Sequence, residues 1–436
     1  MRSITQNHLL QPVDNTSLVL FRIAFGLLIA VESFGAIMTG WVKRVFVDPE
    51  FTFSFIGFEW MQPLPGYGMY FYYGLMGLTG LMVMVGLFYR TSLSLFTVLW
   101  CATYLMQKSS YNNHYYLLIL LCLLMLLVPA HRNASYDVKR NPGLAAQSCP
   151  RWCYEIFKWQ LLIVYTYAAL AKLYPGWLQG DFISMAFKSK AHWPVVGSLL
   201  QLHWLQMGVV VGGVIYDLTI IPLMYWSRTK RFGLYISVAF HLFNSIVFGI
   251  GIFPYLMIAS LVLFFSTSNF KARIPGYVLG TERINRKANL VLWPLLSLYF
   301  AIQLWLPIRH YFIPGDVFFT EEGHRMSWRM MLRSKSGSVT FKLVDKHSGK
   351  IWRVLPNEFL TPKQAFKMSS RPDMIWQFSR FLAKYYAKKG ITDLEIYADA
   401  KANLNGSAMK TLIDPQVDLL TVDWKRFDHQ SWIIVY

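Results

Sequence analysis

Lys172 is an ionisable residue near the outer end of an apolar stretch, residues 155–177, that is long enough to cross a lipid bilayer. A charge at membrane depth is costly, because apolar surroundings disfavour the ammonium form. The same surroundings can leave a neutral amine that acts as a base. The alternative is a lysine whose long side chain reaches the membrane surface and has no chemical role. Position alone leaves both interpretations open.

Further polar residues are predicted to share the outer membrane face with Lys172. They are Asn112, Asn113 and His114 at the entrance of the fourth predicted span, and His241 and Asn244 in the outer half of the seventh. Polar and ionisable residues gathered inside a membrane are typical of substrate sites and proton pathways. This grouping favours a chemical role for Lys172.

Three other charged residues lie inside apolar stretches: Arg22 and Glu32 in the first, and Asp217 near the middle of the sixth. Polar side chains of this kind often only hydrogen-bond between helices and hold a membrane bundle together. We assign Arg22, Glu32 and Asp217 mainly to that structural role.

The composition is that of an integral membrane protein. Of 436 residues, 55% are hydrophobic and only 15% are charged, which is more apolar surface than a soluble domain buries. The net charge of +19 would indicate a nucleic-acid partner in a soluble chain, but here the lysines and arginines gather in short loops between apolar stretches. We therefore expect a membrane partner and no nucleic acid.

The apolar stretches predict about nine transmembrane helices. They lie at about 17–38, 69–88, 92–107, 114–130, 155–175, 207–226, 231–249, 252–267 and 288–307. The seventh and eighth are divided at Gly249, Gly251 and Pro254, because these residues suit a turn. If residues 231–267 formed one long tilted helix, the number would be eight. No cleavable signal peptide is predicted, because the first stretch is too long.

Loop charges predict the orientation. With the N-terminus in the cytoplasm and nine spans, the inner loops, which include residues 132–151 and 271–287, hold most of the lysines and arginines. The outer loops hold only Lys43, Arg44, Lys108, Lys188 and Lys190. This asymmetry follows the positive-inside rule. It places the C-terminal region outside the cytoplasm.

From about residue 308 the sequence predicts a small α+β domain, so we divide the chain into a transmembrane domain, 1–307, and an extracytoplasmic domain, 308–436. β-branched segments at 338–344 and 350–355 flank a hairpin turn. A helix is predicted at about 372–389, and a further strand at 393–400 precedes the Asn405-Gly406 turn.

Common catalytic motifs for phosphate and metal chemistry are absent from the sequence. Cys101 and Cys122 lie in spans, and Cys149 and Cys153 lie in an inner loop. Two thiols are too few for a usual zinc site, and none faces an oxidising compartment. We expect no metal and no structural disulfide.

Several segments together resemble one enzyme family. The run 108–117, KSSYNNHYYL, is similar to the K-T-S-W/Y-N-N-H-x-Y-L segment of vitamin K-dependent gamma-glutamyl carboxylase. Further similar segments follow in the same order: Pro63-Leu64-Pro65, Gly86–Arg90, Ile163-Val164-Tyr165 leading to Lys172-Leu173 and Trp177, Phe240-His241 with Asn244-Ser245, Ser327-Trp328 with Met330-Met331, Ile413–Pro415 with Val417-Asp418, and Ser431-Trp432. Each motif is short, but the resemblance runs from the first span to the last residue.

The resemblance implies a membrane enzyme with an HTTM-like transmembrane domain. It would oxidise vitamin K hydroquinone to the epoxide with dioxygen, and carboxylate a glutamate-containing peptide or protein with carbon dioxide. The residue roles that it implies are Lys172 as the base that deprotonates the quinol, His114 as a catalytic residue at the glutamate with Asn113 beside it, the segment around Leu355 in glutamate binding, and Asn112, His241 and Asn244 in substrate or cofactor binding.

These roles agree with the chemistry that the residues can perform. Removing a proton from the γ-carbon of glutamate is beyond an amine in water, so a much stronger base must arise inside a dry site. A lipid-soluble quinol would arrive through the bilayer and the peptide from outside, and the two would meet near Lys172.

The chain also departs from the family pattern. The animal enzyme continues beyond the point that matches Tyr436, and those extra lumenal regions are tied to recognition of the propeptide, so we expect no high-affinity propeptide binding here. It also carries a lumenal disulfide, whereas no cysteine of this chain is predicted to face outward. These differences favour a shorter bacterial relative in the cell inner membrane; a eukaryotic protein would lie in the endoplasmic reticulum membrane. Two alternatives stay open. One is a quinol epoxidase uncoupled from carboxylation, and the other is a proton-coupled membrane transporter with Lys172, Asp217 and His241 as a relay.

Overall fold

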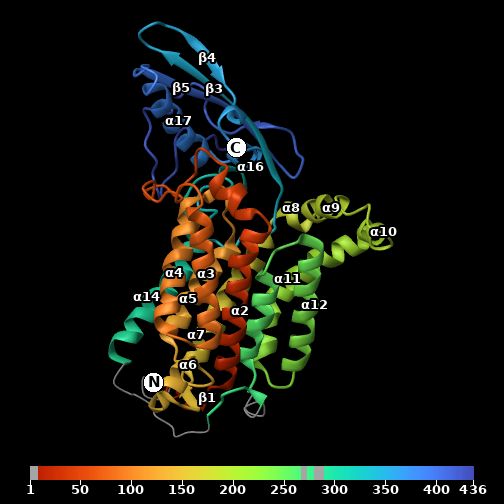
Figure 1. Cartoon of the computed structure of the whole chain (residues 1–436). Helices are drawn as coiled ribbons and strands as arrows, with labels where there is room; N and C mark the ends of the chain where they lie inside the picture. The colour runs from red at the N-terminus through yellow and green to blue at the C-terminus, as the bar shows by residue number, and fades with distance from the viewer. Residues whose placement is uncertain (1–7, 267–272, 279–288) are drawn as a thin grey trace.

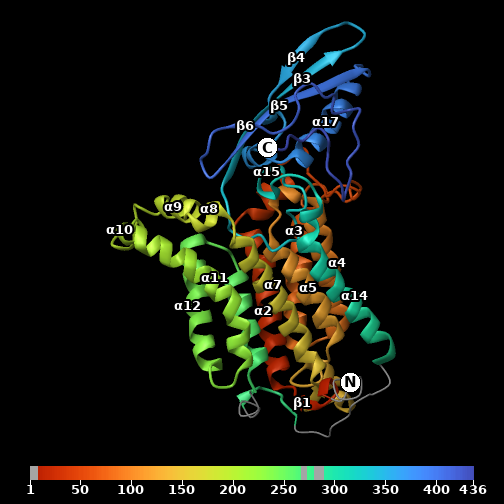
Figure 2. The same cartoon turned by 180° about the vertical axis from the view of Figure 1, so that it is seen from behind.

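The computed structural model describes residues 8–266, 273–278 and 289–436. Within these ranges a bundle of long helices carries a small sheet domain at one end, and the N-terminal segment lies at the opposite end (Figure 1). The same arrangement is seen from behind in Figure 2. Most of the inner loop 271–287 falls outside the described residues, as does the first residue of the ninth predicted span.

A helix lies at each of the nine predicted stretches. They are α2 (Thr16–Met38), α3 (Gly68–Val85), α4 (Tyr89–Met106), α5 (Asn113–Leu127), α7 (Trp152–Lys172), α11 (His203–Tyr225), α12 (Lys230–Phe248), α13 (Phe253–Ser260) continued by η4 (Leu261–Phe264), and α14 (Asn289–Ile308). In the described part of the chain, five helices are long and apolar enough to cross a membrane: α2, α3, α11, α12 and α14 with the residues that follow it. The number of nine crossings stays a prediction.

Local sequence explains where the site-bearing helices begin and end. The side chain of Asn112 accepts a hydrogen bond from Tyr115 N at 2.7 Å and caps the start of α5. At the other end of the site, Pro175 disfavours helical geometry at the preceding Tyr174, which is extended. This stops α7 at Lys172, so the lysine lies at a helix C-terminus, where the helix dipole favours a positive charge.

A close crossing of α2 and α3 holds the centre of the bundle. A Cβ atom at Gly26 would lie 2.3 Å from Met84 N, and a Cβ at Gly80 would lie 2.8 Å from Ala30 N. Only glycine lets the two backbones approach so closely, which is the usual packing mode of membrane helices.

Short helices that the sequence analysis did not predict project sideways beside α11 and α12 (Figures 1 and 2). They are α8 (Pro175–Leu178), α9 (Asp181–Lys188) and α10 (Val196–Leu200). At the inner end lie α6 (Tyr136–Arg140) and a two-stranded sheet of β1 (Pro12–Asp14) and β2 (Ser148–Pro150). All four cysteines are free, as expected.

The C-terminal domain has the predicted hairpin, helix and strand. Its antiparallel sheet has the order β4-β3-β5-β6, and its elements are α15 (Val317–Thr320), β3 (Lys335–Asp345), β4 (Ile351–Val354), α16 (Pro362–Met368), α17 (Pro372–Ala387), β5 (Leu394–Leu404) and β6 (Lys410–Thr411). Inward-facing residues such as Phe341 and Ile396 pack against α17 residues such as Phe378. The domain therefore has a core of its own.

Candidate active site

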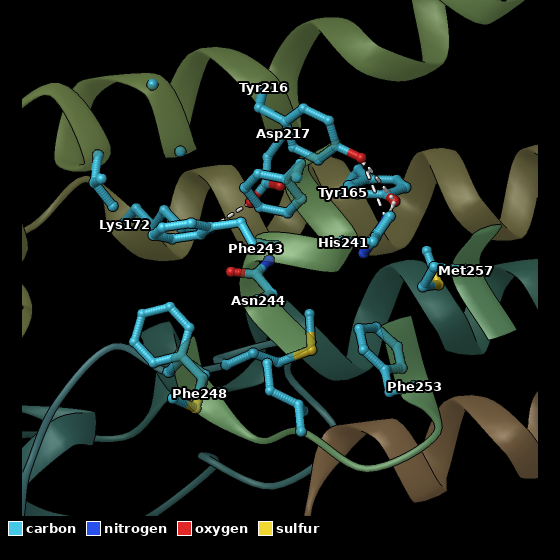
Figure 3. A pocket seen from close by; sticks show the side chains of 18 of the residues that line it. Tyr165, Lys172, Tyr216, Asp217, His241, Phe243, Asn244, Phe248, Phe253 and Met257 are labelled. Atoms are coloured by element: carbon cyan, nitrogen blue, oxygen red, sulfur yellow. Dashed lines mark hydrogen bonds and ion pairs between the residues drawn. The ribbon is translucent and has the colours of Figure 1, made fainter. Parts of the chain in front are cut away.

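An apolar cavity of about 470 Å³ lies between α7, α11 and α12. Its lining includes four of the predicted catalytic and binding residues: His114, Lys172, His241 and Asn244. Figure 3 shows Lys172 on one side of this cavity, His241 on the other, and Asn244 between them. A largely apolar pocket with a few convergent polar groups is the usual form of a small-molecule site.

Lys172 forms one polar end of the cavity. Its ammonium group makes an ion pair with the carboxylate of Asp217 on α11 and lies 5.4 Å from the centre of the Trp177 ring. Lys172 is 8% exposed and Asp217 is 5% exposed. Because both charges are buried, each depends on the other to offset the loss of water. This geometry differs from that of a lysine whose ammonium group merely reaches the membrane surface.

The opposite polar end is a hydrogen-bonded group of four side chains. His241 Nε2 lies 2.9 Å from Tyr165 Oη and 3.3 Å from Tyr216 Oη. Tyr216 Oη in turn lies 2.8 Å from Ser237 Oγ. His241 is 2% exposed, and its Nδ1 has no hydrogen-bond partner in the described part of the chain.

The spacing along α7 sets the separation of the two ends. Tyr165 and Lys172 are seven residues apart, which is about 10 Å along a helix. A flat ring with oxygen atoms at opposite edges matches such a site, because each oxygen would meet one polar end while the ring contacts the apolar walls.

His114 lies where this cavity meets a second one of about 410 Å³. Its ring stacks on Phe253 with 3.9 Å between ring centres. The second cavity also contains Asn112 and Glu32, whose carboxylate accepts a hydrogen bond from Tyr115 Oη at 2.7 Å. The two cavities share His114, Phe248, Ile250, Phe253 and Met331 as lining residues.

The remaining predicted residues lie outside the first cavity. Asn113 is buried behind its wall and donates from Nδ2 to the carbonyl oxygen of Arg329 at 3.0 Å. Leu355 is more than half exposed at the end of β4 and is absent from the lining of both cavities. The structure therefore does not bring Leu355 together with Lys172 and His114. The short segment around Leu355 that resembles the family did not indicate where the end of β4 lies relative to the helices.

The outer wall of the cavity comes from the C-terminal region, because Met330 and Met331 line it. A buried ionic group fastens this region to the bundle: Asp373 receives hydrogen bonds from Arg325 and pairs with Lys108 at 2.7 Å. Burial alone would raise the pKa of the Asp373 carboxyl, but the charges of Arg325 and Lys108 hold it below its ordinary value. Burial lowers the pKa of Lys108 to about 8, against the opposing effect of Asp373.

Comparison with known families covers both parts of the chain. Residues 10–268 match the HTTM domain, and residues 288–436 match the lumenal domain of vitamin K-dependent gamma-carboxylase. The chain belongs to the gamma-glutamyl carboxylase family. No solved structure matches it.

In this member of the carboxylase family, several polar residues of the cavity were not predicted from the sequence. Asp217 was assigned to helix packing, yet it is the partner of Lys172 in the cavity. Tyr165, Tyr216 and Ser237 received no role, because tyrosine and serine in membrane helices often serve only in packing. One signal was present: Ser237, His241 and Asn244 follow an i, i+4, i+7 spacing and so share one face of α12.

Proposed function

We propose that this chain is a vitamin K-dependent gamma-glutamyl carboxylase in which Lys172 is the base that deprotonates the quinol. The main support for this proposal is the position of Lys172 and Asp217 at one end of an apolar cavity. The hydrogen-bonded group around His241 lies at the other end. The family assignment supports a gamma-carboxylase-like activity.

Asp217 gives the lysine a way to act as a base. In the ion pair Lys172 is protonated, but one proton can pass to the Asp217 carboxylate and leave a neutral amine beside a neutral acid. In apolar surroundings this neutral pair competes with the ion pair, since burying charges is costly. The amine then accepts the proton of a quinol hydroxyl, so the pair gains one positive charge that balances the negative charge of the quinol anion.

The opposite end positions the second quinol oxygen. His241 Nδ1 is buried and lacks a partner among the described residues, so it can hydrogen-bond this oxygen. Asn244 lies between the two ends in Figure 3 and can contact the ring substituents. Dioxygen then converts the quinol anion to the epoxide, and the strong base formed on the way removes the γ-proton of glutamate, whose carbanion adds carbon dioxide.

The peptide would enter from the side of the C-terminal domain. Met331 lines the cavity there and is 40% exposed. Arg329 belongs to the same segment, and its buried Nε has no partner in the described ranges, so it can meet a glutamate carboxylate. His114, at the junction of the two cavities, would then lie between quinol and peptide.

The test uses the purified chain in lipid nanodiscs with reduced vitamin K, dioxygen, labelled bicarbonate and a glutamate peptide. We expect both epoxide and labelled peptide. Lys172→Ala should lower epoxidation by about 10²–10⁴, the usual contribution of a general base. Small amines added to the solution should restore part of it.

Lys158→Ala is the matched control, because Lys158 lies on the same helix in an ion pair with Glu155 at 2.9 Å, away from the cavity. It should keep wild-type activity. The double variant Lys172→Gln with Asp217→Asn leaves no unpaired buried charge and should fold while remaining inactive. Wild-type epoxidation by Lys172→Ala would reject the assignment, and epoxide without labelled peptide would indicate the uncoupled epoxidase.

A further inference from the structure

Part of the lining of the first cavity is also exposed on the surface of the helix bundle. Of the residues that line it, only Gly212, Ala239 and Met331 are exposed on the molecular surface. Met331 belongs to the outer wall already described. Gly212 lies on α11 and Ala239 on α12, and these two helices form one side of the bundle in Figures 1 and 2.

Small side chains keep this place open. A Cβ atom at Gly212 would meet no other atom within 4 Å, although Gly212 belongs to the cavity lining. Ala239 contributes a single methyl group on the neighbouring helix. The flanking side chains are exposed and apolar, with Ile215 at 55% and Leu242 at 40%, as expected for a surface in contact with lipid.

Aromatic contacts frame the opening. On one side of it, Tyr216 stacks on Phe240 with 3.8 Å between ring centres. On the other side, Phe187 of α9 packs against Phe243 and Phe248 at 6.4 Å and 6.3 Å. Near Gly212 and Ala239, α12 therefore packs against α11 through Tyr216 and against α9 through Phe187.

The cavity contains a polar group that can bind the polar head of a ligand. His241 Nδ1 is buried, unpartnered among the described residues and part of the lining. A molecule that satisfies this nitrogen and also enters from hydrocarbon must join a polar ring to an apolar tail. An isoprenoid quinol has this form.

We propose that the gap between Gly212 and Ala239 is a lateral window, through which the quinol enters from the bilayer and out of which its isoprenoid tail extends when the ring is bound. This inference rests on the proposed function and specifies the path and the tail site of its lipid-soluble substrate. It makes the α11–α12 face a determinant of specificity for tail length.

The first test is independent of catalysis. A naphthoquinone with a photoreactive diazirine on its tail is bound to the protein in nanodiscs, illuminated, and the labelled peptides are identified by mass spectrometry. We expect adducts on α11 and α12 beside the window. Gly212→Phe with Ala239→Phe should reduce them at least tenfold.

Gly208→Phe is the control, because Gly208 lies one turn away on α11, is also exposed and open, and does not line the cavity. It should label like the wild type. Adducts that gather on other helices, or labelling that the double variant leaves unchanged, would overturn the window.

The second test compares quinols. With the double variant, the KM for a long-tailed quinol should rise at least tenfold more than the KM for a quinol without a tail. An unchanged KM for both quinols would reject the window and leave the proposed function intact. Wild-type protein that epoxidises neither quinol would reject the proposed function, and the labelling pattern would still decide whether the window exists.

Discussion

Asp217 is the residue whose role changes most on passing from sequence to structure. It forms an ion pair with Lys172. In the proposed mechanism it positions the amine and shares its proton. We predict that Asp217→Asn lowers kcat for epoxidation by about 10²-fold, within the range of proton-transfer contributions, and leaves KM for the quinol unchanged. The pH–rate profile should change shape, because one member of a coupled pair is lost.

The matched control is Asp137→Asn. Asp137 accepts hydrogen bonds from Phe88 N and Tyr89 N at the inner end of the bundle and can affect activity only through stability. Recovery in Asp217→Glu would support the role in positioning. A rise in KM with unchanged kcat would instead make Asp217 a substrate-binding residue.

His114 should matter more for carboxylation than for epoxidation. It lies between the two cavities, stacked on Phe253, and can donate a hydrogen bond to negative charge that develops on the glutamate. Loss of one such donor costs about 10²–10³ in rate. His114→Ala should therefore form epoxide with little carboxylated product.

His131→Ala serves as the comparison, since His131 stacks on Tyr89 with 5.0 Å between ring centres at a distance from both cavities. Equal loss of both activities in His114→Ala would assign His114 to the quinol. Unchanged activities would leave it with a packing role.

At this scale the sequence singles out two ionisable residues of the cavity and gives no signal for its tyrosines. Lys172 and His241 stand out because ionisable side chains are rare in apolar spans. Tyr165 and Tyr216 do not, since the same residues serve in helix packing elsewhere. The partner of Lys172 could not be read from the sequence, because α7 and α11 meet only after the short helices α8–α10 turn the chain back.

Among the helices, the crossing of α2 and α3 is the most sensitive contact to substitution. Gly26→Ala places a methyl group 2.3 Å from Met84 N, and backbone atoms cannot give way as a flexible side chain can. We predict a loss of about 1–3 kcal/mol, the typical cost of overpacking, seen as a lower Tm in detergent.

Gly74→Ala is the control on α3, because a Cβ atom there meets nothing within 4 Å. Its Tm should stay at or above that of the wild type. Equal Tm values for Gly26→Ala and the wild type would mean that the two helices can separate without cost.

Helix positions follow from hydropathy, but the connections between them do not. Each predicted stretch contains a helix because its apolar length exceeds what any loop would carry. The excursion α8–α10 was missed, since it consists of short helices broken by glycine and proline. It nevertheless contributes Trp177, Phe182 and Ile183 to the cavity.

The junction of the bundle and the C-terminal domain depends on ionised Asp373. A carboxyl whose pKa is depressed in the folded state stabilises the fold above its unfolded pKa of about 3.9, and this contribution is lost as pH falls through the folded value. We predict that Asp373→Asn costs about 3–5 kcal/mol at pH 7, because two buried cations lose their partner.

The difference in Tm between Asp373→Asn and the wild type should therefore narrow as the pH is lowered from 7 to 3. Asp428→Asn is the control, since Asp428 is exposed, forms an ion pair with Lys425 at 3.7 Å and accepts a hydrogen bond from the neighbouring His429 N at 2.8 Å. It should not shift Tm at either pH. If the difference in Tm between Asp373→Asn and the wild type stayed constant with pH, the loss of stability would not come from the ionised carboxylate.

For the whole molecule, composition and hydrophobic pattern predicted a helical membrane part and a small α+β part in the correct order. They could not predict how the parts meet, because the junction uses single residues far apart in sequence, such as Asn113 and Arg329. Such contacts leave no periodic signal. The outer wall of the cavity, at Met330 and Met331, therefore appears only in the structure.

The cavity has two exposed edges, one at Gly212 and Ala239 between membrane helices and one at Met331 beside the C-terminal domain. For a ligand that enters by the first edge, the effective concentration is its mole fraction in the bilayer. For a ligand that enters by the second edge, it is the concentration in water. Adding inert lipid at fixed total amounts of quinol and peptide should then lower the occupancy of the quinol site and leave the occupancy of the peptide site unchanged. Under the proposed function, the rate then depends on the fraction of reduced quinol in the membrane as well as on the supply of peptide.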